Sequence, residues 1–189
     1  MFKILFHEDY FAFISDFGLS NAIASVFEDN PVGVFQYMAP ELFSKKKYAK
    51  SAEMFSFGVV MAEMSSGKRP YSDIPYENDL EICLEVLRDR RPTFGKGTPQ
   101  RYIDLAMKCM RKDPEKRPTA EEVKESIFYW YNSVKEYHVG YKEMIKIKEE
   151  FDNYDKMIPT YEKNEGNDNG NMSYMSKTLT FVPIDSGGN

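Results

Sequence analysis

The segment from Ser51 to Ser66 constrains the fold of this chain more than any other part of the sequence. Its apolar residues cover most of the circumference of a predicted helix: Met54, Phe55, Phe57, Val59, Val60, Met61 and Met64. A helix that is apolar nearly all round is expected to be buried. Gly58 in its middle costs about 1 kcal/mol of helix propensity relative to alanine, so we expect it to allow close packing of a neighbour. Gly67 and Pro70 predict where the helix ends.

The rest of the pattern predicts a mainly α protein with one short β-hairpin at the N-terminus. The hairpin joins two apolar runs, 3–6 and 10–14. A short helix is expected over 39–44, and amphipathic helices are expected over 78–88, 99–110 and 120–131. The apolar positions of the helix over 78–88 are Leu80, Ile82, Leu84 and Leu87.

Local signals mark where two of these helices begin. Thr98 is expected to cap the helix over 99–110, with Pro99 at its first position. Thr119 and Glu122 have the spacing of a capping box for the helix over 120–131.

Composition excludes several classes of function. The 189 residues carry a formal net charge of −5, which argues against nonspecific nucleic-acid binding. The two cysteines, Cys83 and Cys109, form no metal-binding motif and fit a reducing compartment. The N-terminal apolar run is too short for a signal peptide, and the longest apolar stretch, around 57–64, is too short for a membrane span. We therefore expect a cytoplasmic protein with no nucleic-acid or membrane partner.

The sequence changes character after residue 134. Residues 135–163 are mostly charged and predict a helical extension, whereas 164–189 are rich in Asn, Gly and Ser and predict a disordered tail.

Three motifs occur in a telling order. Asp16-Phe17-Gly18 follows a short apolar run, Ala39-Pro40-Glu41 opens the next helical region, and Lys116-Arg117-Pro118-Thr119 precedes the last amphipathic helix. This order resembles the C-terminal lobe of a eukaryotic protein kinase. The residues in and around these motifs are most similar to the tyrosine-kinase-like group, whose members mainly phosphorylate Ser and Thr. The resemblance covers about residues 3–131. It implies that 1–134 is a partial kinase domain, a helical C-lobe without its N-lobe.

The resemblance also implies a nucleotide site, with ATP and Mg²⁺ as the cofactors of the intact family. Asp16 would hold Mg²⁺ on the ATP phosphates, next to Phe17, which sets its orientation, and Gly18. Leu5 and Ser15 stand where the family lines the floor of the ATP pocket.

Further along, Glu41 and Arg117 match a buried ion pair that ties the activation segment to the late helices. A bidentate pair of this kind gives orientation as well as energy. The stretch between the first two motifs supplies the remaining candidates: Gly33, Val34 and Tyr37 in the loop that would receive the substrate residue, and Ser20 and Ser25 as phosphorylation sites.

Several parts of the kinase signature do not occur in the printed sequence: the Gly-rich loop, the strand Lys and the His-Arg-Asp catalytic loop. No catalytic residue is therefore assigned. The triplet from His7 to Asp9 lies too close to Asp16 and is interpreted as a strand turn. Lys3 would stand where the second Mg²⁺ ligand belongs, and Glu53 where an Asp usually holds the catalytic loop. Val34 replaces a Thr that is common in Ser/Thr kinases.

We therefore expect an N-terminally truncated member of the protein kinase family that does not phosphorylate on its own. The alternatives are a non-catalytic, pseudokinase-like interaction or scaffold module, and a regulatory decoy whose loop is itself phosphorylated. Protein partners are expected. Self-association is expected too, through the apolar face of the helix over 51–66 that a missing neighbour would leave exposed.

Overall fold

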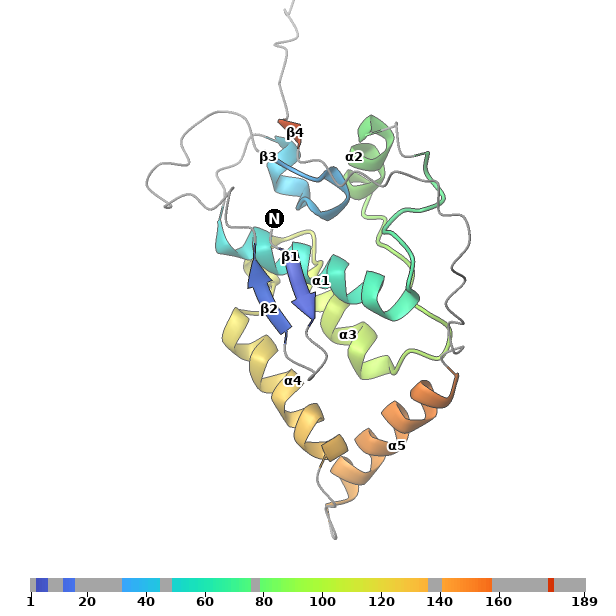
Figure 1. The fold of residues 1–189 in the computed structure, drawn as a ribbon. Coiled ribbons are helices and arrows are strands. Elements are labelled where there is room, and N and C mark those ends of the chain that lie inside the picture. Colours follow the sequence, from blue (N-terminus) through green and yellow to red (C-terminus); the bar gives the residue numbers. More distant parts are fainter. Residues whose placement is uncertain are drawn as a thin grey trace, which may run out of the picture.

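The structure, a computed structural model, describes residues 3–6, 12–15, 32–44, 49–75, 79–135, 141–157 and 177–178. Helices dominate this part, as the sequence predicts (Figure 1). The α-helices are α1 (Lys50–Ser66), α2 (Asp79–Leu87), α3 (Gln100–Cys109), α4 (Ala120–Lys135) and α5 (Lys142–Met157). The 3₁₀ helices are η2 (Phe35–Tyr37), η3 (Pro40–Ser44) and η4 (Pro114–Lys116). The strands are β1 (Lys3–Phe6), β2 (Ala12–Ser15), β3 (Val32–Gly33) and β4 (Lys177–Thr178). None of the helices described is long and apolar enough to cross a membrane.

Helix α1 is central to the described fold and contacts η2, α3 and η4. Its Phe55 and Val59 are fully buried, as its apolar circumference predicts, whereas Met64 of the same predicted set is 62% exposed. Gly58 lies where α1 meets α3. A Cβ atom there would come within 2.7 Å of the Ala106 carbonyl oxygen and 2.7 Å of Met110 Cγ, distances that real side chains do not adopt. The predicted role of Gly58 in close packing is therefore confirmed.

Helix α2 packs on η2 and η3, and it does so through a different face from the predicted one. Its buried residues are Ile82, Cys83 and Val86. Leu80 is 70% exposed and Leu84 is 41% exposed. At 3.6 residues per turn, positions 80, 84 and 87 lie along one side of the helix and 82, 83 and 86 along the other. The predicted set thus spans two faces: Ile82 is buried, Leu87 is half-buried, and Leu80 and Leu84 are exposed.

The signals for the helix starts have different outcomes. At α4 the capping box is confirmed: Thr119 N–H donates to Glu122 Oε2 at 2.7 Å, and Glu122 N–H donates to Thr119 Oγ1 at 3.3 Å. At α3 the predicted cap is wrong. The Thr98 hydroxyl donates to the Gly95 carbonyl oxygen at 2.7 Å, and Pro99 occupies the N-cap position. The preceding turn uses the hydroxyl that would have capped the helix.

Helix α5 folds back on α4, and the two form a V at the bottom of Figure 1. The charged region was expected to be helical, and α5 is a separate helix whose Ile147 is fully buried. Phe151 packs on Trp130 of α4, with ring centroids 5.9 Å apart. Trp130 packs in turn on Tyr102 of α3, with centroids 6.4 Å apart. An aromatic row thus connects α5 to the helices that precede it.

The described strands form two antiparallel pairs. β1 pairs with β2, so the N-terminal hairpin is confirmed, with its second strand at 12–15 instead of 10–14. β3 pairs with β4 near the end of the chain, a pairing that the sequence does not predict. Apart from β4, the predicted tail over 164–189 lies outside the described residues.

Candidate functional site

The loop predicted to receive a substrate residue, 33–37, is tied to α1. Val34 and Tyr37 are buried. The Tyr37 hydroxyl donates to Glu63 Oε2 at 2.7 Å, and the Ser56 hydroxyl donates to the Tyr37 carbonyl oxygen at 2.7 Å. Within the loop, Tyr37 N–H donates to the Val34 carbonyl oxygen at 3.0 Å. These bonds fix the loop backbone relative to the central helix.

Gln36, in the middle of η2, carries a buried acceptor that has no partner among the described residues. The residue is 2% exposed, and its Oε1 accepts no hydrogen bond. Buried polar side-chain atoms nearly always have a partner, so an exception calls for an explanation. Beside it, Phe35 stacks on Phe43 at a centroid distance of 6.2 Å, which closes the apolar side of the loop.

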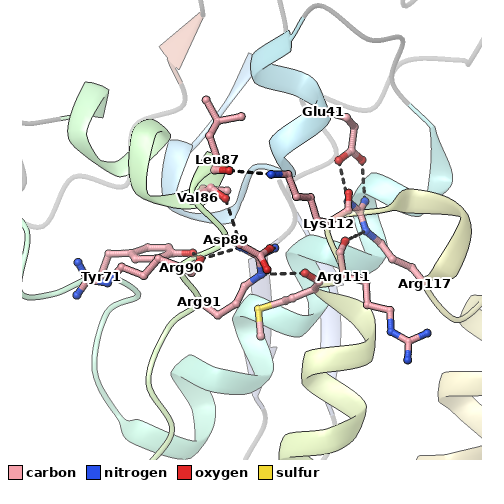
Figure 2. A network of polar contacts seen from close by, with 11 residues as sticks. Glu41, Tyr71, Val86, Leu87, Asp89, Arg90, Arg91, Arg111, Lys112 and Arg117 are labelled. Carbon is pink, nitrogen blue, oxygen red and sulfur yellow. Dashed lines mark hydrogen bonds and ion pairs between the residues drawn. The ribbon is translucent and has the colours of Figure 1, made fainter.

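Glu41 and Arg117 form the ion pair that the resemblance implies. Arg117 Nη1 lies 2.6 Å from Glu41 Oε1, and Nη2 lies 2.7 Å from Oε2. The Arg117 side chain is 0% exposed and that of Glu41 is 8% exposed. Arg117 also donates to the carbonyl oxygens of Arg111 at 2.8 Å and Ser51 at 2.9 Å. A buried charge is tolerated when its donors are satisfied in this way, so the pair rigidly joins η3 to the turn before α4 (Figure 2).

The Phe55 ring of α1 lies between two guanidinium groups. Arg117 Cζ is 5.2 Å from the ring centroid and Arg91 Cζ is 5.1 Å from it, within the range of a cation–π contact. Arg91 Nε donates to the Met110 carbonyl oxygen at 2.8 Å. Burial lowers the pKa of Arg91, and the Asp89 carboxylate opposes this. Figure 2 shows both arginines in one network that connects η3, the end of α2 and the turn before α4.

Sequence reasoning missed Ser56, Glu63 and Arg91. Ser56 and Glu63 stand seven residues apart, two helical turns, so they lie on one face of an otherwise apolar helix. That polar pair is a signal that could have identified the anchor of Tyr37. Arg91 follows the end of α2 and precedes Pro92, and nothing local indicates that its side chain is buried.

The residues predicted to line the nucleotide site are described only in part. Leu5 and Ser15 belong to the paired strands β1 and β2, opposite Phe13 and Lys3 respectively. The others lie outside the described residues: Asp16, Phe17, Gly18, Ser20 and Ser25. Within the described parts, no three His, Cys, Asp or Glu residues gather where they could hold a metal ion.

Glu53, predicted to replace an Asp that holds the catalytic loop, lies in the first turn of α1 and is exposed. Gly33 is the last residue of β3. The structure thus brings the loop 33–37, Glu41 and Arg117 together around α1.

Comparison with known proteins agrees with this arrangement. The model of the protein kinase domain matches residues 3–129. A mimivirus protein named as a serine/threonine-protein kinase/receptor (Acanthamoeba polyphaga mimivirus) is 35% identical over 64% of this chain and 7% of its own length. A LIM domain-containing serine/threonine-protein kinase of Dictyostelium discoideum is 33% identical over 64% of this chain and 12% of its own.

A mitogen-activated protein kinase kinase of Pyricularia oryzae is 31% identical over 58% of this chain and 29% of its own length. The chain thus spans under a third of each of these three relatives. Because the family model matches well over half of its residues, the chain belongs to the protein kinase family.

Proposed function

We propose that this chain provides the substrate-side part of a serine/threonine protein kinase, in which the loop 33–37 presents a peptide to the site of phosphoryl transfer. The observation that carries the proposal is the anchoring of this loop to α1 through Tyr37 and its continuation into the buried Glu41–Arg117 pair. Phosphoryl transfer is mostly positioning, and a loop whose Tyr37 end is fixed to α1 suits that task. The names of the relatives favour Ser and Thr as acceptors.

The unpartnered oxygen of Gln36 supports a peptide as the ligand. An extended peptide offers backbone N–H donors along its whole length. A donor that reached Oε1 would satisfy an acceptor that is otherwise buried without a hydrogen bond.

Protein kinases use ATP and Mg²⁺, and in this chain Asp16 is the proposed ligand of the metal, with Leu5 and Ser15 below the nucleotide. When bound, ATP supplies the phosphoryl group. The printed sequence contains no His-Arg-Asp base, no Gly-rich loop and no strand Lys. We therefore propose that the 189-residue chain does not transfer phosphate unless these groups are supplied to it.

The loop's role is tested with a fluorescent degenerate peptide that contains Ser and Thr acceptors. Tyr37→Phe removes the hydrogen bond to Glu63, which is worth about 0.5–1.5 kcal/mol, and should weaken peptide binding several-fold in anisotropy titrations. Tyr131→Phe, at a position 53% exposed on α4, is the matched control. Equal binding by the two variants would contradict the proposal.

The enzymatic part is tested with radiolabelled ATP and the same peptide. We expect no more label transfer from the chain than from its Asp16→Ala variant. Turnover that Asp16→Ala abolishes would show that the chain is a complete catalyst, and the expected inactivity would then be wrong.

A second candidate function is a non-catalytic interaction module with protein partners, possessing neither a nucleic-acid nor a membrane ligand. Exposed apolar side chains favour it: Leu80 and Leu84 on α2, and Phe128 (62%) and Tyr131 on α4. Such patches often mark protein-binding or self-association surfaces. Light scattering separates the candidates, because a module that self-associates forms dimers that Phe128→Lys disperses. A cytoplasmic location belongs to both, since Cys83 and Cys109 are unpaired and buried.

A further inference from the structure

Strand β4 lies against the start of the candidate substrate loop. β4 pairs with β3 antiparallel, with Thr178 opposite Val32 and Lys177 opposite Gly33. Gly33 is also the first residue of the loop 33–37. Figure 1 shows β4 beside β3 at the top of the molecule, on the side opposite to the V of α4 and α5. Two segments far apart in the sequence thus share one backbone edge.

Such an edge is a recognised way to bind peptides. An extended peptide adds a strand to an exposed strand, and its backbone N–H and C=O groups pair with those of the host. Within the described residues, β3 has β4 as its strand partner. A peptide that enters the loop through 33 would meet this same edge first.

We propose that the segment around Lys177–Thr178 is an intramolecular competitor of peptide substrates, which occupies the β3 edge and must leave before a peptide can use it. This rests on the proposed function, because it takes the loop 33–37 as the place where peptides bind. The segment has the chemistry of the peptide substrates with which it would compete. Ser176, Thr178 and Thr180 carry acceptor-type hydroxyl groups, and Phe181 and Val182 continue a run that favours strands.

Helix α5 anchors the tether that carries this segment. Arg101 of α3 holds Glu150 through contacts of 2.6 and 3.1 Å. The Tyr154 hydroxyl donates to the Ser65 carbonyl oxygen at 2.6 Å, and Ile147 is fully buried. The base of the tether is therefore fixed to α1 and α3.

The number of residues between α5 and β4 is sufficient for β4 to reach β3. Nineteen residues, 158–176, separate α5 from β4, and such a linker reaches up to roughly 65 Å when extended. Two paired residues supply few backbone hydrogen bonds, each of small net value. A pairing this small is readily reversible, as a competitor requires.

Disulfide trapping in the full chain tests the register. Residues directly opposite in an antiparallel pair have Cα atoms about 4.5–5.5 Å apart, which suits a disulfide. We expect the Val32→Cys/Thr178→Cys variant to cross-link at least several times faster in a glutathione buffer than Val32→Cys/Thr180→Cys. The control keeps the same side of an extended strand but shifts the register. Equal rates for the two variants would overturn the docking.

The native cysteines do not interfere with this experiment. Cys83 and Cys109 are both buried, and burial raises the pKa of the Cys83 thiol to about 12 and that of Cys109 to about 11. Thiols attack disulfides as thiolates, so these two react slowly.

The trapped chain then tests competition with the fluorescent degenerate Ser/Thr peptide. The reduced Val32→Cys/Thr178→Cys chain should bind the peptide, the oxidised chain should lose most of this binding, and reductant should restore it. Equal binding in both states would overturn the proposal. A reduced chain that binds no peptide would overturn the proposed function and the competition with it, while the trapping rates would still decide the docking.

Discussion

Two bidentate arginine–glutamate pairs connect separate elements of the described residues, and they lie in opposite environments. Arg117 and Glu41 are 0% and 8% exposed at their side chains, whereas Arg101 and Glu150 are 21% and 30% exposed. Both pairs are bidentate. The first connects η3 to the turn before α4, within the part that the kinase model matches. The second connects α3 to α5, beyond it.

The difference shows how the two regions are held together. The buried pair concentrates its contribution in a few short hydrogen bonds that no water can replace, so it fails if either partner is lost. The docking of α5 is spread over a partly exposed pair, the Trp130–Phe151 contact and the Tyr154 hydroxyl. Each of these is modest, and water can substitute for some of them. We therefore expect single substitutions to destabilise the kinase-like region strongly and the α5 region only weakly.

The largest expected effect comes from the same substitution at each arginine. Arg117→Met leaves the Glu41 carboxylate buried without a partner and should lower the free energy of unfolding by about 3–5 kcal/mol. Arg101→Met leaves Glu150 near water and should cost at most about 1 kcal/mol. Urea denaturation followed by circular dichroism measures both.

A charge-free variant controls for this comparison. Glu41→Met/Arg117→Met removes both charges of the buried pair and should recover part of the loss, because no unpaired carboxylate remains. If Arg101→Met costs as much as Arg117→Met, exposure does not distinguish the two pairs.

The second effect tests how α3 is held on its other side, by α1. Gly58→Ala would place a Cβ atom 2.7 Å from the Ala106 carbonyl oxygen, so α1 and α3 must separate. We expect a net loss of about 1–3 kcal/mol from this overpacking, despite the better helix propensity of alanine. Thermal melts measure it. Met64→Ala, at a position 62% exposed on α1, should change stability by no more than about 0.5 kcal/mol. A Gly58→Ala chain as stable as wild type would show that the α1–α3 contact yields easily.

Sequence reasoning succeeded where a structural feature depends on residues close together in the sequence or on a strong family motif. The capping box of Thr119 and Glu122 depends on a spacing of three residues, and the end of α1 at Gly67 depends on a left-handed conformation, φ 63°, that glycine favours. The pairing of Glu41 with Arg117 spans much of the chain, and the resemblance to kinases supplied it where periodicity could not.

Sequence reasoning failed where contacts with another element of the fold decide which of several residues is buried or which hydrogen bond forms. Leu80 and Ile82 are equally apolar, and only the position of η2 and η3 selects which one is buried. The Thr98 hydroxyl has the chemistry of a helix cap, but it donates to the Gly95 carbonyl oxygen of the preceding turn instead. The docking of α5 and the β3–β4 pairing join segments far apart in sequence, and no local pattern encodes them.

The smallest expected effect is the pH dependence of the Arg101–Glu150 pair. The hydrogen bond from Arg101 lowers the pKa of Glu150 in the folded chain. A lowered folded-state pKa means that the pair's contribution is complete above the pKa of Glu150 in the unfolded chain, and is lost as the pH falls through the folded value. The melting temperatures of wild type and Glu150→Gln should therefore differ near neutral pH and converge as the pH falls below the ordinary pKa of a glutamate, about 4.3. Because the pair lies near the surface, its contribution to the free energy of unfolding should not exceed about 1 kcal/mol. Glu149→Gln, an exposed position of the same helix, controls for the loss of one negative charge. A difference in melting temperature that persists unchanged to the lowest pH would show that Glu150 holds α5 by packing and not by its charge. The two pairs would then differ in the kind of interaction as well as in exposure.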